Sequence, residues 1–592
     1  MDGALGTVSS DILTWNSYQF YDDAFFTRGT HTIKVGFAAE RMQNDEFSGG
    51  VPPNGSFKFD SLSTFLQNQP HSLLIDDPTT TRPINVRQTL FGAYVQDDWH
   101  ARPNLTLNFG VRYEPVTLPT DAHGTFAVLT SLTSPAETPV KTLWASNQTL
   151  HNFEPRIGFA WDPFHNGKTA VRGGFGIFDV LPLSWEYTHG STGVLPYQLQ
   201  KGVTTLPPGS FPTGAVGLAQ TVDLSTVGVR LVEQHPHRNY ALNWNLNIQH
   251  EIASNLTAAI AYVGSHAVHS PFSTDDSNMV LPTLTSAGYL WPNPVGSGTR
   301  LNPNVGRIRA LWWDNSSVYH GLQAGLAKRM SHGFQVQGSY TWSKCLDSGS
   351  GGLLGDPYAN SLSSLMFFNR GARHGLCDFN IAQNFVVNYL WQPGAPKFGG
   401  AITEHALGGW EFGGVVVVST GSPFTVLIAG DPLGQNSTDP FGYASRVAGP
   451  GCGNPVTGDV NGYIKLSCFS VPTVPASFAG ACQTAVDGSG VPIPNTCMNL
   501  FGNAGRNTVI GPGLKNVDFS AFKNNYIPRI SETFNIQFRA EFFNIFNHPN
   551  FQSPVKHNAI FNQDGSPASG AGVINSTTTS SRQIQFGLKI IW

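Results

Sequence analysis

The chain has 592 residues, too many for one ordinary compact soluble domain, and only 12% of them are charged. Soluble globular proteins carry about 25% charged residues, so the composition disfavours an ordinary soluble fold. The formal net charge of −4, without any run of Lys or Arg, argues against a nucleic-acid partner. No apolar run reaches the ~18 residues of a membrane-spanning helix.

The chain begins with Met1–Gly6, which contains no basic segment followed by an apolar stretch. The sequence therefore predicts no secretory signal peptide at this position. If the chain functions outside the cytoplasm, we expect its export signal to lie in a longer precursor.

Segments of about ten to fourteen residues alternate between apolar and polar side chains. In one of them Leu105, Phe109 and Tyr113 share a face. Such alternation suits a strand between lipid and water, although strands of soluble sandwiches alternate too. We expect fifteen strands, at 15–27, 31–41, 88–100, 104–114, 152–162, 168–179, 238–251, 255–265, 317–329, 333–343, 378–391, 407–419, 514–524, 532–545 and 582–592.

The polar faces of these strands are rich in Asn, Gln, Arg and Glu, which suits a water-filled lumen. The candidate lumen-lining residues are Asn243, Asn245, Gln537, Arg539 and Glu541. Aromatic residues near strand ends are candidates for interfacial girdles, with packing at the end of a sandwich as the alternative. These are Trp99, Trp161, Trp342, Trp391, Trp410 and Trp592.

Short and long connections alternate along the chain. Tight links such as 28–30 and 101–103 stand between loops of about 35 to 95 residues, the longest near 420–513, and 393–406 is a link of medium length. Short periplasmic turns and long extracellular loops are typical of outer-membrane barrels. The sequence therefore predicts an all-β fold, a transmembrane antiparallel β-barrel.

The direction and number of the predicted strands indicate whether the barrel is complete. The first and last predicted strands both run toward the short-turn rim, and single-chain bacterial barrels have an even number of strands. We therefore expect residues 1–592 to be a single barrel domain that lacks the front of a larger protein. Its export signal would be lost with that front.

Six cysteines lie in or beside two predicted outer loops. An even number in an oxidising compartment suggests disulfides. Neighbour pairing would join Cys345 to Cys377, Cys452 to Cys468 and Cys482 to Cys497. A metal cluster is the alternative, which the absence of a C-x-x-C motif disfavours.

Catalytic motifs are missing from the sequence. There is no H-E-x-x-H and no G-x-S-x-G, and the glycine-rich run 348–352 lacks the Lys and Ser/Thr of a phosphate loop. We expect no enzyme activity, no cofactor and no metal. A long outer loop does place flat aromatic rings beside guanidinium groups, which could grip a sugar or a peptide, with loop packing as the alternative. These candidate ligand residues are Arg307, Arg309, Trp312 and Trp313.

The last strand places an apolar stripe at the C-terminus: Phe586, Leu588, Ile590 and Trp592. A terminal strand of this kind resembles the C-terminal assembly signal of bacterial outer-membrane barrels, although an edge strand of a soluble sandwich alternates in the same way. The resemblance implies contact with outer-membrane lipid and with the barrel assembly machinery.

Several segments, taken in order, resemble TonB-dependent outer-membrane receptors of the Oar-like type. They are Gly29–Gly36, Tyr94–Trp99, Leu105–Glu114, Glu154–Trp161, Tyr262–Ser265, Ser339–Lys344, Gly505–Thr508, Gly511–Gly513 and Arg539–Pro549. The resemblance implies a barrel of about 22 strands that takes up a large or scarce extracellular solute, such as a carbohydrate, a peptide or a siderophore-like compound.

The same resemblance implies an N-terminal plug and the TonB complex as a partner. The sequence shows no plug, TonB box or regulatory-like domain, so we expect TonB to act through a segment that this chain does not contain. The expected location is the bacterial outer membrane. A secreted all-β binding or adhesion protein is the alternative function.

Overall fold

The computed structural model describes residues 11–592, except for 49–55, 77–79, 81, 182–185, 188–189, 191–192, 204–205, 213–226, 275, 351–365, 396–399, 436–441, 475 and 556–557. Its main sheet has eighteen strands, of which β7 (Thr120–Asp121), β13 (Val229–Val232) and β20 (Gly375–Leu376) are short pieces. The long strands are β1 (Asp11–Arg28), β2 (His31–Ser48), β5 (Ile84–Arg102), β6 (Leu105–Tyr113), β10 (Phe153–Trp161), β11 (Thr169–Asp179), β14 (Tyr240–Ala253), β15 (Leu256–Thr274), β18 (Ile308–Ser331), β19 (Phe334–Asp347), β21 (Gln383–Trp391), β22 (Trp410–Ser419), β31 (Leu514–Tyr526), β32 (Asn535–Phe543) and β34 (Gln583–Ile591).

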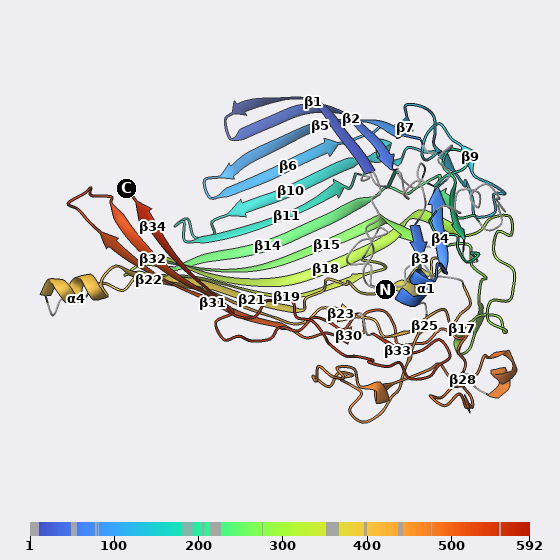
Figure 1. Ribbon diagram of the computed structural model, residues 1–592. Helices are drawn as coiled ribbons and strands as arrows, with labels where there is room; N and C mark the ends of the chain where they lie inside the picture. The colour runs from blue at the N-terminus through green and yellow to red at the C-terminus, as the bar shows by residue number, and fades with distance from the viewer. Residues whose placement is uncertain are drawn as a thin grey trace.

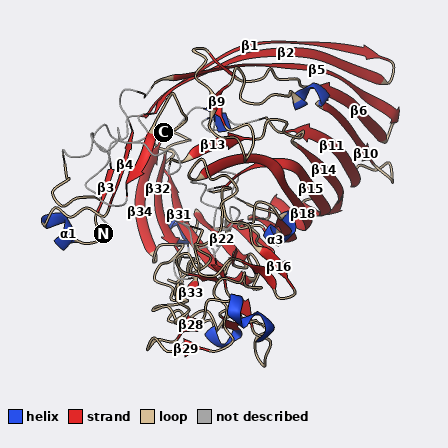
Figure 2. Ribbon diagram, turned by 90° about the vertical axis from the view of Figure 1, so that its right-hand side faces the viewer, coloured by secondary structure: helices blue, strands red, loops and turns tan. Residues whose placement is uncertain are grey.

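Each long strand pairs antiparallel with the next one in chain order, from β1 through to β34. The sheet curves into a wall (Figures 1 and 2). The fifteen predicted strands and the antiparallel fold class are thus confirmed. Within the described residues, β1 pairs only with β2 and β34 only with β32, so the sheet is open between them.

The two rims of the wall differ, as the alternation of connections predicts. Short turns lie at one rim, and the long connections gather at the other, where Figure 1 labels β4 (Ser72–Asp76), β17 (Gly288–Leu290) and β28 (Ala485–Val486). The link of medium length lies at the short-turn rim and contains the helix α4 (Gly400–Leu407). No helix among the described residues has the length and apolar character needed to span a membrane.

The long connections fold together into a packed structure, called the loop cap here. Two clusters of buried residues form its main cores. One contains Phe424, Val426, Ala444, Tyr463, Ile464, Cys468, Phe469, Ala504, Val509, Ile560 and Ile574. The other contains Ile84, Val86, Phe126, Val128, Leu143, Trp144, Tyr187, Val232, Leu311 and Trp313. Each core joins two long connections, and the second core also includes residues of β5 and β18, so the loops support one another.

Several strands extend further toward the cap than predicted. β2 reaches Ser48, β15 reaches Thr274, and β18 already begins at Ile308. In the extensions of β15 and β18, consecutive residues such as Phe272 and Ser273 or Ala310 and Leu311 are buried, so the alternation that marks a lipid–water wall is lost. The register of β15 on β18 also shifts between Val268 and Phe272.

Candidate functional site

The strand pairing divides the wall into two continuous faces, because directly paired residues on neighbouring antiparallel strands share a face. One row of paired residues crosses nine strands: Lys34, Gln96, Gly110, Arg156, Gly176, Asn243, Ser265, Tyr319 and Cys345. The polar face is the face that contains this row. The opposite, apolar face carries rows such as Leu246, Tyr262, Leu322 and Trp342.

The apolar face is exposed over most of the wall. Its solvent-accessible residues include Phe109, Ile157, Phe175, Leu246, Ile248, Tyr262, Leu322, Phe385, Phe538 and Phe586. A continuous exposed apolar surface of this size is unstable in water and suits hydrocarbon. Register also places five of the six candidate girdle tryptophans on this face, namely Trp99, Trp161, Trp342, Trp391 and Trp410, while Trp592 directly follows the last paired residue of β34. Their role as a girdle stays a prediction.

The predicted lumen residues Asn243, Asn245, Gln537, Arg539 and Glu541 all belong to the polar face. Gln537 Nε2 donates to Asn524 Oδ1 at 2.8 Å, and Arg539 Nε donates to Gln537 Oε1 at 2.7 Å. The Arg539 guanidinium also lies 5.0 Å from the centre of the Phe522 ring, within cation–π range.

Sequence reasoning missed a charged hollow on the polar face between β1 and β10. Its volume is about 570 Å³, and its lining includes Asp23, Lys34, Tyr94, Gln96, Asn108, Arg112 and Arg156. Lys34 pairs with Asp98 at 2.8 Å, and Tyr94 Oη donates to Asp23 at 2.8 Å. Arg112 pairs with Glu114, and Arg156 pairs with Glu154 at 2.5 Å.

The signal for this hollow was present in the sequence. Lys34 and Arg112 each lie between two apolar residues inside predicted strands, and Asp98 lies in a third predicted strand. The strand order alone, however, does not give the register that brings these charges together.

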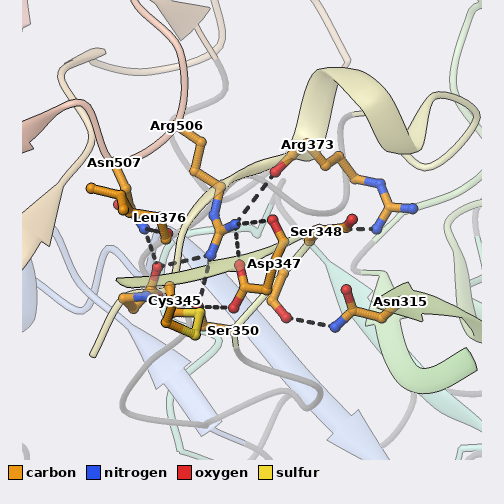
Figure 3. A network of polar contacts seen from close by, with 12 residues as sticks. Asn315, Cys345, Asp347, Ser348, Ser350, Arg373, Leu376, Arg506 and Asn507 are labelled. Atoms are coloured by element: carbon orange, nitrogen blue, oxygen red, sulfur yellow. Dashed lines mark hydrogen bonds and ion pairs between the residues drawn. A yellow bond between two sulfur atoms is a disulfide. The ribbon is translucent and has the colours of Figure 1, made fainter. Parts of the chain in front are cut away.

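A buried ionic network ties the cap to the wall (Figure 3). Arg506, from the longest connection, pairs with Asp347 at the end of β19 and with Asp378 at 3.1 Å. It also donates to Ser350 Oγ at 2.7 Å and to the carbonyl oxygen of Arg373 at 3.4 Å. All three ionic side chains are almost fully buried. The network therefore joins segments that lie more than a hundred residues apart in sequence.

The pKa values of the two arginines of this network shift in opposite directions. Burial alone would lower the pKa of Arg506, but the carboxylates of Asp347 and Asp378 outweigh it, so its pKa is raised. Arg373 has weaker support, because Asp314 is half exposed, and burial lowers its pKa to about 10. The Arg373 guanidinium also lies 4.1 Å from the centre of the Phe272 ring.

The structure pairs the six cysteines as neighbours, which is the predicted pattern. Cys345 joins Cys377, Cys452 joins Cys468, and Cys482 joins Cys497. The first bond links the end of β19 to the segment beside β20, and the other two close small loops in the cap. Within the described residues, no three His, Cys, Asp or Glu side chains gather in a way that could hold a metal ion.

The candidate ligand residues are placed differently from the prediction. Arg309, Trp312 and Trp313 belong to the extension of β18 and not to a loop, and Arg307 directly precedes it. Trp313 is a buried core residue of the second cap cluster, and Trp312 stacks on Phe367 with 6.2 Å between ring centres. The predicted loop position of these two rings is wrong, because β18 continues into the cap. Trp313 is buried there, and a ligand role for the partly buried Trp312 stays a prediction.

The C-terminal stripe is highly exposed, from 51% at Ile590 to 85% at Trp592. β34 pairs with β32, and Phe586 stacks on Phe538 with 6.1 Å between ring centres. The stripe therefore continues the apolar face to the edge of the described sheet. Its role as an assembly signal stays a prediction.

The chain is similar in sequence or in structure to several known proteins. The profile of the family described as "Outer membrane beta barrel domain" matches residues 4–585. The TonB-dependent transporter Oar of Myxococcus xanthus is 22% identical over 362 residues, which are 53% of this chain and 30% of Oar. The outer membrane transporter YddB of Escherichia coli is 11% identical with a TM-score of 0.49, covering 97% of this chain and 54% of YddB.

The ferripyoverdine receptor of the outer membrane of Pseudomonas aeruginosa matches with 12% identity and a TM-score of 0.44, covering 98% of this chain and 48% of the receptor. The chain thus spans less than a third of the length of Oar and about half of each of these solved chains. Because the family profile covers nearly all of its residues, the chain belongs to the family of outer membrane β-barrel domains and resides in the bacterial outer membrane.

Proposed function

We propose that the chain forms the barrel wall of a TonB-dependent receptor that takes up a large or scarce solute across the outer membrane. The observation that carries this proposal is the division of the wall into two faces, one of which carries amide and charged side chains such as Gln96, Asn245 and Arg539. A wall with one wet and one lipid-facing surface suits passage of a solute and not bond chemistry. The similarity to Oar supports the TonB-dependent class.

The loop cap would select the solute, and the polar face would guide it. A carbohydrate, a peptide or a siderophore-like compound fits a lumen lined by amides and paired charges. Arg307 and Arg309 remain candidate ligand contacts at the base of the cap. No enzyme activity is proposed, since the matched relatives are named as transporters and receptors.

The proposed partners follow from the same wall. Outer-membrane lipid would cover the apolar face, and the barrel assembly machinery would recognise β34. TonB would act through a plug that fills the lumen, and further strands would close the gap between β1 and β34. The exposed apolar face speaks against the alternative of a secreted adhesion protein, which would present that face to water.

The test is solute accumulation in cells that express the complete gene product, with and without TonB. We expect accumulation that requires both TonB and the receptor, together with slower gel migration after heating, because closed barrels resist unfolding by SDS. Equal accumulation without TonB would exclude energised uptake. Migration unchanged by heating would count against the barrel itself.

A further inference from the structure

The centre of the polar face differs from its flanks in charge. From Asn243 to Gln249 in β14 and from Gln335 to Ser343 in β19, every polar-face position is uncharged, and the same holds for the middle of β15, β18 and β21. The flanks carry charges such as Lys34 and Glu541. A solute at the centre of the wall therefore meets uncharged side chains, among them the amides and hydroxyls of β14 and β19.

A hollow of about 260 Å³ lies at the cap end of this neutral region. The sheet lines it with Tyr319, Gln323, Thr341 and Asn384, and the strap, defined as residues 377–382, adds Phe379 and Asn380. None of its described lining residues is charged. The hollow thus combines aromatic rings with neutral amides and hydroxyls.

The strap is fixed against the wall at three points. The Cys345–Cys377 disulfide anchors its start. The backbone N–H of Cys345 donates to Asn380 Oδ1 at 2.8 Å, and Ser343 Oγ donates to the carbonyl oxygen of Ile381 at 3.0 Å. These contacts hold Phe379, which is 48% exposed, beside the hollow. The hollow is therefore built by the fold rather than by a mobile surface.

Tyr319 lies along the wall because Gly321 leaves room for its ring. A Cβ at Gly321 would lie 2.7 Å from Tyr319 Oη, which is too close, and 3.1 Å from Cζ, which is a tight contact, so the Tyr319 ring would have to shift. The ring therefore rests over the glycine and forms part of the floor of the hollow. A ring in this position can pack its face against an apolar face of a solute.

We propose that this hollow binds a neutral oligosaccharide, a specification that rests on the proposed uptake function. The aromatic rings of Tyr319 and Phe379 would pack against the C–H faces of sugar rings. Gln323, Thr341 and Asn384 would exchange hydrogen bonds with sugar hydroxyls, which are both donors and acceptors. A charged solute would find no counter-charge in the lining, and burying its charge unpaired is costly.

An extended peptide fits the hollow less well. Peptides are commonly held by adding a strand to an exposed sheet edge. β18, β19 and β21 lie in the interior of the sheet, and each is paired on both sides. The backbone at this site therefore offers no free edge to a peptide.

The test is calorimetric titration of the complete gene product, folded in a detergent without a sugar headgroup, with maltohexaose, cellohexaose and chitohexaose. A neutral hexapeptide of alternating Ala and Ser serves as the comparator. We expect at least one oligosaccharide to bind and the peptide not to bind. Failure of all three sugars, or tighter binding of the peptide, would overturn the proposal. TonB is absent from this assay, so its result is separate from that of the uptake test.

Three variants locate the binding. Tyr319→Ala and Phe379→Ala should each weaken binding by about two- to tenfold, as expected for the loss of one ring contact. Gly321→Ala keeps both rings but displaces Tyr319, and it should weaken binding similarly. Phe385→Ala, on the apolar face of β21, is the matched control and should bind like the parent. An equal loss in this control would overturn the site assignment.

A labelling measurement that keeps Tyr319, Gly321 and Phe379 unchanged tests the site even if one of those variants fails to fold. In this protein Ser339→Cys places a thiol on the polar face two residues from Thr341. The bound oligosaccharide should slow maleimide labelling of this thiol. Labelling at the same rate with and without a sugar that binds would place the sugar elsewhere and refute the proposal.

Discussion

Arg506 is the residue whose loss should damage the cap most. Replacing it by Met would leave the buried carboxylates of Asp347 and Asp378 without a counter-charge, which typically costs about 3–5 kcal/mol. We expect the Arg506→Met cap to open. Hydrogen exchange of the Asn507 amide, which donates to Thr425 Oγ1, should report this opening.

Arg370→Met is the matched control for that prediction. Arg370 pairs with Asp314 at 3.2 Å, but both side chains are about half exposed. An exposed pair contributes only about 0–1 kcal/mol. Equal protection of the Asn507 amide in both variants would show that the buried network does not hold the cap.

The two faces of β32 should tolerate charge differently. Phe538 lies on the apolar face, so Phe538→Arg should destabilise the folded barrel by about 2–4 kcal/mol if the site is near the bilayer midplane. Gln537→Arg, on the polar face of the same strand, should cost much less. Urea unfolding of the protein in lipid vesicles measures both. Equal destabilisation would argue for a wall that is buried on both faces.

Glu137 should make the stability of the cap depend on pH. It is buried in the cap, and its two carboxyl oxygens accept from the backbone N–H groups of Leu195 and Arg230. Burial raises its pKa from 4.5 to about 8. The folded state therefore holds the proton of Glu137 more tightly than the unfolded chain does. The stabilisation of the folded cap by this protonated carboxyl is complete below pH 4.5 and is lost as the pH rises toward 8.

Urea unfolding between pH 5 and 8 checks this expectation. The free energy of unfolding should fall with rising pH, and Glu137→Gln, which cannot ionise, should remove that part of the slope. An unchanged slope in the variant would show that Glu137 is already ionised in the folded cap.

At the scale of single elements, we expect β34 to govern assembly. Its apolar stripe ends at Trp592, whose side chain is exposed at the edge of the described sheet. Deleting Trp592 in the complete gene product should lower the amount in the outer membrane and leave more in the periplasm. Fractionation followed by immunoblotting measures this ratio. An unchanged ratio would contradict the assembly-signal interpretation.

The elements also show what the sequence can and cannot predict. All fifteen long strands were predictable, because lipid on one side and water on the other impose a period of two that local sequence must carry. The extensions of β15 and β18 were not, since packing in the cap replaces that pattern. For the same reason the sequence leaves both a ligand contact and loop packing open for Trp313, which the structure buries in the cap.

The candidate sites divide in the same way. Alternation was enough to assign Asn245 and Arg539 to the polar face. The neighbour pairing of the cysteines followed from short separations in sequence. The Arg506 network and the hollow over Gly321 depend on contacts between segments far apart in sequence. No local sequence pattern predicts which of these segments meet.

At the scale of the whole molecule, the open sheet leads to the last prediction. β1 and β34 both run toward the short-turn rim, so pairing them directly would give a parallel contact in a wall whose other long pairs are all antiparallel. In the described sheet neither strand has a second partner. Unpaired N–H and C=O groups in hydrocarbon cost several kcal/mol each, so the 592-residue chain alone should insert poorly or leave a leaky wall.

Release of a small dye from lipid vesicles, together with the fraction of chain that inserts, measures this expectation. A closed eight-stranded barrel of known tightness provides the control for vesicle integrity. If the chain inserts fully, resists SDS until heated and leaves the vesicles tight, then β1 and β34 close the wall without further strands. In that case the proposed function would no longer require a barrel with further strands. High dye release with full insertion would instead fit a wall that requires additional strands between β1 and β34.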